Sequence, residues 1–166
     1  MTATRTDRGT TETTTVYTEG QDLVMERIFD APRELVWKVM IDPERVTRWW
    51  GPHGYTTTVV EMDVRPGGRW RWINHTTGGE DVPFKGEYLE VVPPERIVRT
   101  EILDVPGFDD RAAIDTMTFE ALGNRTKLVA RTRFPSIDDL EGALATGMIG
   151  GALQTYDRLA AEIAKG

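Results

Sequence analysis

Most of the chain after residue 54 consists of short strand-like segments joined by turns, and one long amphipathic segment follows them. The strand candidates are 55–64, 69–75, 84–92, 96–103, 114–122 and 125–134, with Pro, Gly or Asn between them. Links of hairpin length join consecutive strands as antiparallel pairs, because parallel strands need a crossover connection. The pattern predicts an antiparallel meander.

The final segment, 136–163, has an apolar residue at every third or fourth position. Ser136 and Asp139 approximate a capping box at its start. The recurring positions are Ile137, Leu140, Leu144, Met148, Ala152, Tyr156, Leu159 and Ile163. We predict one amphipathic helix of about seven turns. The sheet and this helix have to bury their apolar faces against each other.

A strand at 23–30 precedes two helix-start signals. Pro32 opens one short helix and Pro43 opens a second. The expected fold class is therefore α+β. A curved seven-stranded antiparallel sheet surrounds a long C-terminal helix, and two short helices follow the first strand.

Residues 1–20 contain nine threonines and few large apolar side chains. Such a segment buries too little surface to offset its ordering entropy, so we predict a flexible tail before a single domain at 21–166. Threonine also favours strands, and Thr14 to Thr18 could instead extend the first strand.

The composition excludes several classes of function. A net charge of −7 and a pI near 4.9 disfavour binding to nucleic-acid phosphates. The absence of cysteine excludes disulfides, thiolate metal sites and thiol nucleophiles. No segment is apolar enough for a membrane span or a secretory signal. We expect a cytoplasmic protein without nucleic-acid partners or membrane insertion.

Motifs for catalysis and metal binding are missing. The two histidines, His53 and His75, lack carboxylates at metal-ligand spacing, and no nucleophile elbow or phosphate loop occurs. A carboxylate that faced inward could act as an acid or base; the candidates are Glu61, Asp63, Glu87, Glu90 and Glu101. Most are expected to face outward, and His75 and Glu101 are the first to examine. We predict no catalytic residue, no metal and no cofactor.

Strand alternation places Trp70 and Trp72 on one face, which we expect to be concave. The final helix contains glycines that each cost about 0.5–1 kcal/mol, namely Gly142, Gly147, Gly150 and Gly151. They indicate tight packing, room for a ligand, or both. The predicted ligand walls are Trp70, Trp72, Tyr88, Met117, Met148 and Tyr156, with Trp49 and Trp50 at the mouth. A hydrophobic plug is the alternative for Trp49 and Trp50.

Several segments of the chain form a recognisable set: Arg27-Ile28-Phe29-Asp30-Ala31-Pro32, Arg48-Trp49-Trp50-Gly51-Pro52, Asp63-Val64-Arg65-Pro66-Gly67-Gly68, Pro93-Pro94-Glu95-Arg96 and Asp157-Arg158-Leu159. This set resembles the START-like (SRPBCC, helix-grip) superfamily. Within it, the chain is most similar to homologues of the heat-shock-protein-90 ATPase activator, C-terminal-domain type. The resemblance implies a helix-grip fold with a deep cavity between sheet and helix. Superfamily members bind lipids, polyketides and other hydrophobic ligands, and some cyclise or hydrolyse them.

The leading functional expectation is non-catalytic binding of a small hydrophobic molecule. One alternative is a polyketide-cyclase-like or hydrolase-like enzyme, and another is a chaperone-interacting module. The eukaryotic activators carry a separate chaperone-binding domain, and the 20 residues before this domain are too short to form one. This argues against direct ATPase activation. The sequence leaves a monomer and a homodimer equally open.

Overall fold

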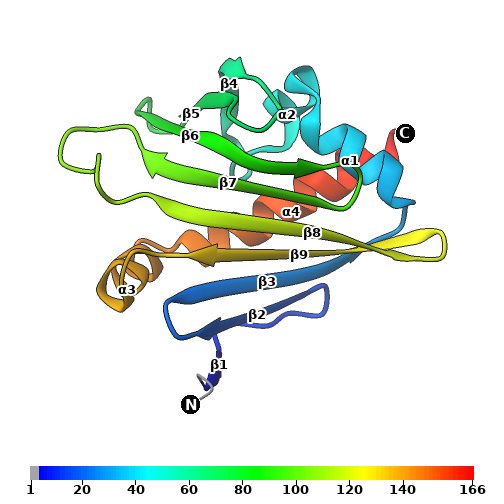
Figure 1. Cartoon of the computed structure of the whole chain (residues 1–166), viewed down its shortest axis with the longest axis horizontal. Helices are drawn as coiled ribbons and strands as arrows, with labels where there is room; N and C mark the ends of the chain where they lie inside the picture. Colours follow the sequence, from blue (N-terminus) through cyan, green and yellow to red (C-terminus); the bar gives the residue numbers. More distant parts are fainter. Residues whose placement is uncertain (1–3) are drawn as a thin grey trace.

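The computed structural model describes residues 4–166. Within them the elements are β1 (Arg5–Asp7), β2 (Thr14–Glu19), β3 (Asp22–Phe29), α1 (Arg33–Ile41), α2 (Pro43–Trp49), β4 (Thr56–Met62), β5 (Arg69–His75), β6 (Asp81–Val92), β7 (Arg96–Leu103), β8 (Ala113–Leu122), β9 (Arg125–Arg133), α3 (Ile137–Ala145) and α4 (Met148–Ala164). The strands form one antiparallel sheet in the order β1-β2-β3-β9-β8-β7-β6-β5-β4. Figure 1 shows α4 crossing behind this sheet. The predicted α+β helix-grip fold is confirmed.

The sheet has nine strands, two more than the sequence predicts. The seven predicted strands correspond to β3–β9, and the threonine-rich segment supplies β1 and β2. The expectation of a flexible tail is therefore wrong for these strands, and residues 1–3 lie outside the described part of the chain. The reason is that β2 pairs with β3 over its whole length, from Thr14 opposite Arg27 to Glu19 opposite Asp22. Val16 is 0% exposed and packs in a small apolar cluster with Leu23, Met25 and Leu140. The β2 edge of the sheet is therefore stabilised by buried side chains as well as by strand pairing.

The predicted single C-terminal helix is divided into α3 and α4. Gly147 adopts a left-handed conformation with φ +83° between them, and its N–H donates to the carbonyl of Leu144 at 3.2 Å. Glycine reaches this conformation without the steric cost of a Cβ atom, so it ends α3. A Cβ added at Gly142, Gly147 or Gly150 would meet no atom within 4 Å, and all three are exposed. They face solvent, so the idea that they leave room for a ligand is wrong.

The main core lies between the concave face of the sheet and the helices α1, α2 and α4. Trp37 of α1 packs edge-on against Phe119 of β8, with ring centres 5.3 Å apart. Leu159 and Ile163 are buried on α4. These contacts fix the C-terminal half of α4 over the sheet.

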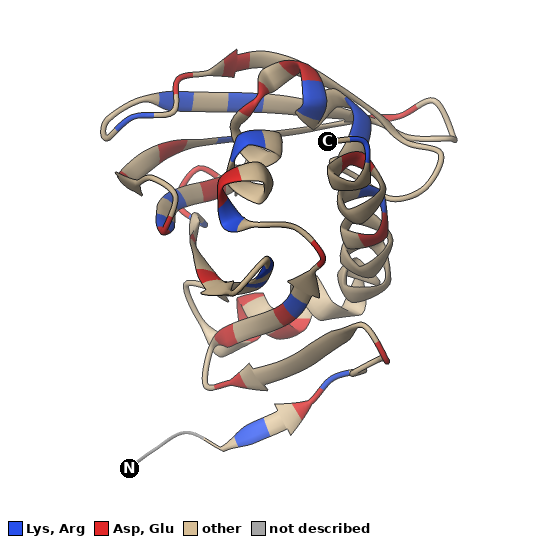
Figure 2. Cartoon of the chain, turned by 90° about the vertical axis from the view of Figure 1, so that its right-hand side faces the viewer, with Lys and Arg blue, Asp and Glu red and all other residues tan. Residues whose placement is uncertain are grey.

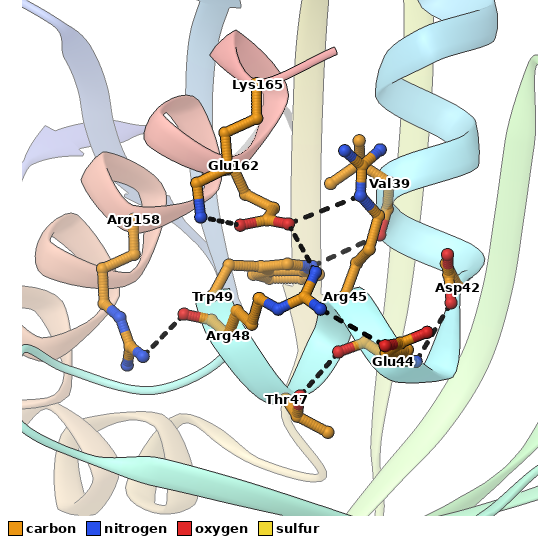
Figure 3. Close-up of polar contacts among 10 residues, drawn as sticks. All are labelled: Val39, Asp42, Glu44, Arg45, Thr47, Arg48, Trp49, Arg158, Glu162 and Lys165. Atoms are coloured by element: carbon orange, nitrogen blue, oxygen red, sulfur yellow. Dashed lines mark hydrogen bonds and ion pairs between the residues drawn. The ribbon is translucent and has the colours of Figure 1, made fainter.

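A polar cluster joins α2 to α4 (Figure 3). The carboxylate of Glu162, which is 4% exposed, lies 3.4 Å from Arg45 Nε and accepts hydrogen bonds from Arg48 at 3.2 Å and Lys165 at 2.9 Å. Arg158 donates to the backbone carbonyl of Arg48 at 2.6 Å. The ion pairs and this bond hold α2 in place, and α2 carries Trp49 at its end.

Acidic and basic residues are interspersed along strands and helices in the view of Figure 2. Within residues 4–166, every helix is too short or too polar to cross a bilayer. The predicted aromatic wall of Trp70 and Trp72 lies in the interior.

Candidate ligand-binding site

The indoles of β5 form the wall of the concave face. Trp70 and Trp72 are buried, as the alternation predicts, and their ring centres lie 4.8 Å apart. Arg99 of β7 lies over both rings, with its guanidinium carbon 4.2 Å from the centre of Trp70 and 4.9 Å from that of Trp72. Trp70 also donates its indole N–H to the carbonyl of Thr100 at 3.0 Å. The wall is thus tied to β7, which places a charged side chain against it.

A cavity of about 20 Å³ lies beside this wall. Its lining consists of apolar side chains and one guanidinium: Met40, Ile41, Trp49, Met62, Trp72, Tyr88, Ile97, Arg99 and Met117. The volume is that of roughly one water molecule, whereas pockets for drug-sized ligands measure about 300–1,000 Å³. The cavity therefore takes one small chemical group, and a larger molecule requires side chains to move.

Charged residues continue from Arg99 along the concave face. Arg99 and Asp115 are cross-strand neighbours, and Arg99 Nε donates to Asp115 Oδ2 at 3.4 Å. Thr132 of β9 donates to the other oxygen of Asp115 at 2.9 Å. Glu101 lies with its carboxyl 4.0 Å from Arg99 Nη2, which is beyond hydrogen-bond distance. One guanidinium thus faces two carboxyl groups inside the grip.

Glu101 holds a proton at neutral pH. Burial raises the pKa of Glu101 to about 8, the neighbouring Asp115 carboxylate adds to this effect, and Arg99 opposes it. Its side chain nevertheless remains 26% exposed. With Glu101 protonated, the charges of Arg99 and Asp115 balance, so these three residues together carry no net charge.

Two tyrosines complete the interior. Burial raises the pKa of Tyr88 on β6 and also that of Tyr156 on α4, so both hydroxyls are neutral. Tyr156 meets Phe29 edge-on with ring centres 6.4 Å apart, and it packs against both apolar clusters. Tyr156 is half-buried, as is Met117. Both side chains pack against the main apolar cluster.

The cavity brings together four of the eight residues predicted as ligand contacts: Trp49, Trp72, Tyr88 and Met117. Trp50 and Trp70 pack edge-on or tilted against Trp72 without lining the cavity. Met148 belongs instead to the apolar cluster near β2. Trp49 is buried and donates its indole N–H to the Val39 carbonyl at 3.4 Å, so it also acts as the plug that the sequence left as an alternative.

The sequence interpretation missed Arg99 and Asp115 as interior residues. In β7 the inward positions Ile97, Arg99 and Glu101 alternate with positions that are equally apolar, so the pattern did not identify the inner face. Glu101, one of the carboxylates that the sequence offers as an acid or base, lies near Arg99 in the interior. The sequence of β7 alone carries no signal for Arg99, because its contact with Trp70 joins β7 to β5 across β6.

His75 lies at the outer end of β5. Its Nδ1 lies 2.7 Å from Asp81 Oδ1, and its Nε2 lies 2.6 Å from Thr58 Oγ1, and the site is exposed. This position leaves His75 no part in the interior site. Among residues 4–166 no group of three or more His, Cys, Asp or Glu side chains is arranged to hold a metal ion.

Replacing Glu101 with glutamine is expected to stabilise the protein at neutral and alkaline pH by several kcal/mol. The folded-state pKa of Glu101 lies above its unfolded value. Unfolding therefore releases a proton, and wild-type stability falls as pH rises from about 4.3 to about 8. Glutamine does not titrate, so the variant's advantage grows across this range and vanishes at acid pH. Urea unfolding at several pH values measures it. Glu87→Gln, at an exposed position, is the control, and equal pH profiles for wild type and Glu101→Gln would contradict the assignment.

Similar proteins support the fold and the family. The model of the family described as Activator of Hsp90 ATPase homolog 1-like protein matches residues 30–164. A protein of Arthrobacter aurescens has a TM-score of 0.84 at 20% identity, covering 92% of each chain. Ms6760 of Mycobacterium smegmatis has a TM-score of 0.78 at 25% identity and covers 86% of this chain and 90% of its own. CV1439 of Chromobacterium violaceum has a TM-score of 0.73 at 28% identity and covers 86% and 96%. No functionally curated protein matches the sequence.

The match spans α1 to α4 and includes every strand from β4 to β9. The START-like resemblance seen in the sequence is confirmed, and this fold supports a ligand-binding or activator-like module. The chain belongs to the family of Activator of Hsp90 ATPase homolog 1-like proteins.

Proposed function

We propose that the protein binds one small, largely apolar molecule between the concave face of the sheet and α4, without changing it chemically. The observation that supports this most is the cavity between Trp72, Tyr88 and Met117. Met117 is half-buried at this cavity, and half-buried Tyr156 packs against the same apolar cluster. Family membership supports the same reading.

The cavity wall is able to rearrange. Met40, Met62 and Met117 supply three of its lining side chains, and unbranched methionines adapt their shape at low cost. Burying one large apolar group stabilises a complex by about 1.5–3 kcal/mol, so a few such groups give micromolar affinity. Ligand entry therefore requires movement of flexible side chains and leaves the sheet intact.

An enzyme of the polyketide-cyclase or hydrolase kind is the second candidate. The position of Glu101 favours it, because a protonated interior carboxyl group can act as a general acid. Asp115 is already engaged by Arg99 and Thr132, which leaves no free base beside it. Binding without catalysis therefore explains more of the geometry.

Native mass spectrometry of the purified protein tests the proposal. We expect an additional mass from a co-purified apolar molecule, or uptake of the uncharged probe N-phenyl-naphthylamine with enhanced fluorescence. Met117→Trp fills the cavity and should abolish both signals while the protein stays folded. Ile28→Trp, on the outer face at an exposed position, is the matched control and should bind as the wild type does.

A protein that neither carries a molecule nor takes up the probe would rule out the binding proposal. Co-precipitation with the chaperone and stimulation of its ATPase, unchanged in Met117→Trp, would instead support the activator-like reading that the family description suggests. Conversion of the bound molecule would support the enzyme.

A further inference from the structure

One buried hydrogen-bond donor at the cavity lacks an acceptor, and the guanidinium of Arg99 lines the same cavity. Trp72 is 2% exposed, and its indole Nε1 has no hydrogen-bond partner among the described residues. Arg99, whose side chain is 9% exposed, makes its hydrogen bond to Asp115 through Nε, and Nη2 stays 4.0 Å from Glu101. Both residues line the same cavity. A buried donor without an acceptor costs about 1–3 kcal/mol, so a group that supplies an acceptor gains this energy on binding.

We propose that the cavity is a recognition subsite for a neutral carbonyl oxygen at one end of the apolar ligand, held by Trp72 Nε1 and the terminal nitrogens of Arg99. This inference rests on the proposed function and names the chemical class of its ligand. An oxygen that only accepts hydrogen bonds matches a site whose free groups only donate. The cavity of about 20 Å³ has the size of such a group.

The charges around the subsite select against ionic ligands. Asp115 and Glu101 lie 3.4 Å and 4.0 Å from nitrogens of Arg99, and the pair shares one negative charge while Glu101 holds a proton. An anionic head group would find the charge of Arg99 already balanced by Asp115, and a cationic one would meet the guanidinium. Tyr88 and Tyr156 face the cluster as neutral hydroxyls. A neutral acceptor is the class that meets no repulsion.

The remainder of the ligand lies outside the cavity. Met117 lines the cavity and is half-buried, and Tyr156 continues the apolar surface from the sheet to α4. An aliphatic or aromatic tail attached to the carbonyl carbon would rest on these two side chains. Trp49 and Ile41 also line the cavity.

A series of probes with one skeleton and different end groups tests the proposal. Isothermal titration calorimetry should rank benzylacetone, a ketone, above butylbenzene, and both above hydrocinnamate and phenylpropylamine. Trp72→Phe keeps an aromatic ring and removes the N–H, so it should weaken benzylacetone binding about fivefold and leave butylbenzene unchanged. Trp37→Phe, at an indole packed on Phe119 away from the cavity, is the matched control and should change neither affinity.

A second measurement uses the wild type alone, so it does not depend on whether Trp72→Phe folds. The carbon-13 carbonyl resonance of bound benzylacetone should move downfield, as it does when a carbonyl accepts hydrogen bonds. Equal affinities for benzylacetone and butylbenzene, an unshifted resonance, or a preference for either ion would overturn the carbonyl subsite while the binding function stands. Failure of all four probes to bind, with no co-purified molecule, would remove the proposed function as well.

Discussion

Gly86→Ala is expected to destabilise the domain by about 3 kcal/mol or more. A Cβ atom at this position would lie 1.8 Å from the backbone oxygen of Thr100 and 2.5 Å from Trp70 Nε1. Both atoms are held by the hydrogen bond between them, and Gly86 is the cross-strand partner of Trp70. Relief of the clash requires the separation of β6 from β7 or the displacement of the indole wall. Neither movement is small, because the backbone of Thr100 is part of the sheet.

Thermal and urea unfolding of the variant measure this effect, and Gly142→Ala is the matched control. Gly142 lies within α3, is exposed, and a Cβ there would meet no atom within 4 Å. The control should gain about 0.5–1 kcal/mol from helix propensity. If Gly86→Ala unfolds at the same urea concentration as the wild type, the close approach of Trp70 to Thr100 is wrong, and with it the position of Arg99 over the indole.

The sequence predicted the seven strands β3–β9 because each has a turn signal at its ends, from Pro66-Gly67 to Gly123-Asn124. It failed for β2, where composition indicated a tail. Local composition does not report that the edge of β3 is available for pairing, and Val16 gains its burial only from that contact. The break at Gly147 was missed because the apolar repeat continues across it. The repeat is in fact shared by two helices, α3 before Gly147 and α4 after it.

The indole wall was predictable and the charges against it were not. Trp70 and Trp72 alternate with arginines, so only one face of β5 could be buried. In β7 both faces carry apolar residues, and Ile102 on the outward face is buried as well. The strand's own pattern therefore does not identify its inner face. The inward position of Arg99 follows from register with Asp115, which is a property of two strands rather than of either alone.

Glu162→Gln is expected to destabilise the protein by about 3 kcal/mol at neutral pH. The carboxylate is 4% exposed and lies among Arg45, Arg48 and Lys165. A neutral amide has the same shape but leaves these cations without a compensating charge, and Arg45 is itself largely buried. Breaking a buried ion pair by removing one partner costs more than the pair contributes, since the remaining charges stay desolvated. The contact between α2 and α4 should be the first part of the structure to open in this variant.

The pH dependence distinguishes the charge from the shape of this side chain. Burial acts to raise the pKa of Glu162, but the hydrogen bonds from Lys165 and Arg48 outweigh it, so the pKa lies below its usual value. The contribution is therefore present above the unfolded-state pKa of about 4.3 and disappears as pH falls through the folded-state value. Wild type and Glu162→Gln should differ at pH 7 and converge below about pH 4 in urea unfolding.

Glu44→Gln is the matched control, because Glu44 pairs with the same arginine, Arg48, at 3.3 Å while its own side chain is 80% exposed. Water screens a pair of this kind, so the control should change stability by less than about 1 kcal/mol at pH 7. Hydrogen exchange in Glu162→Gln should increase first in α2, whose last turn also accepts a hydrogen bond from Arg158. Because α2 ends at Trp49, which lines the cavity, the same variant should take up N-phenyl-naphthylamine faster than the wild type. Unchanged exchange in α2 would show that the ion pairs do not hold this helix over the interior.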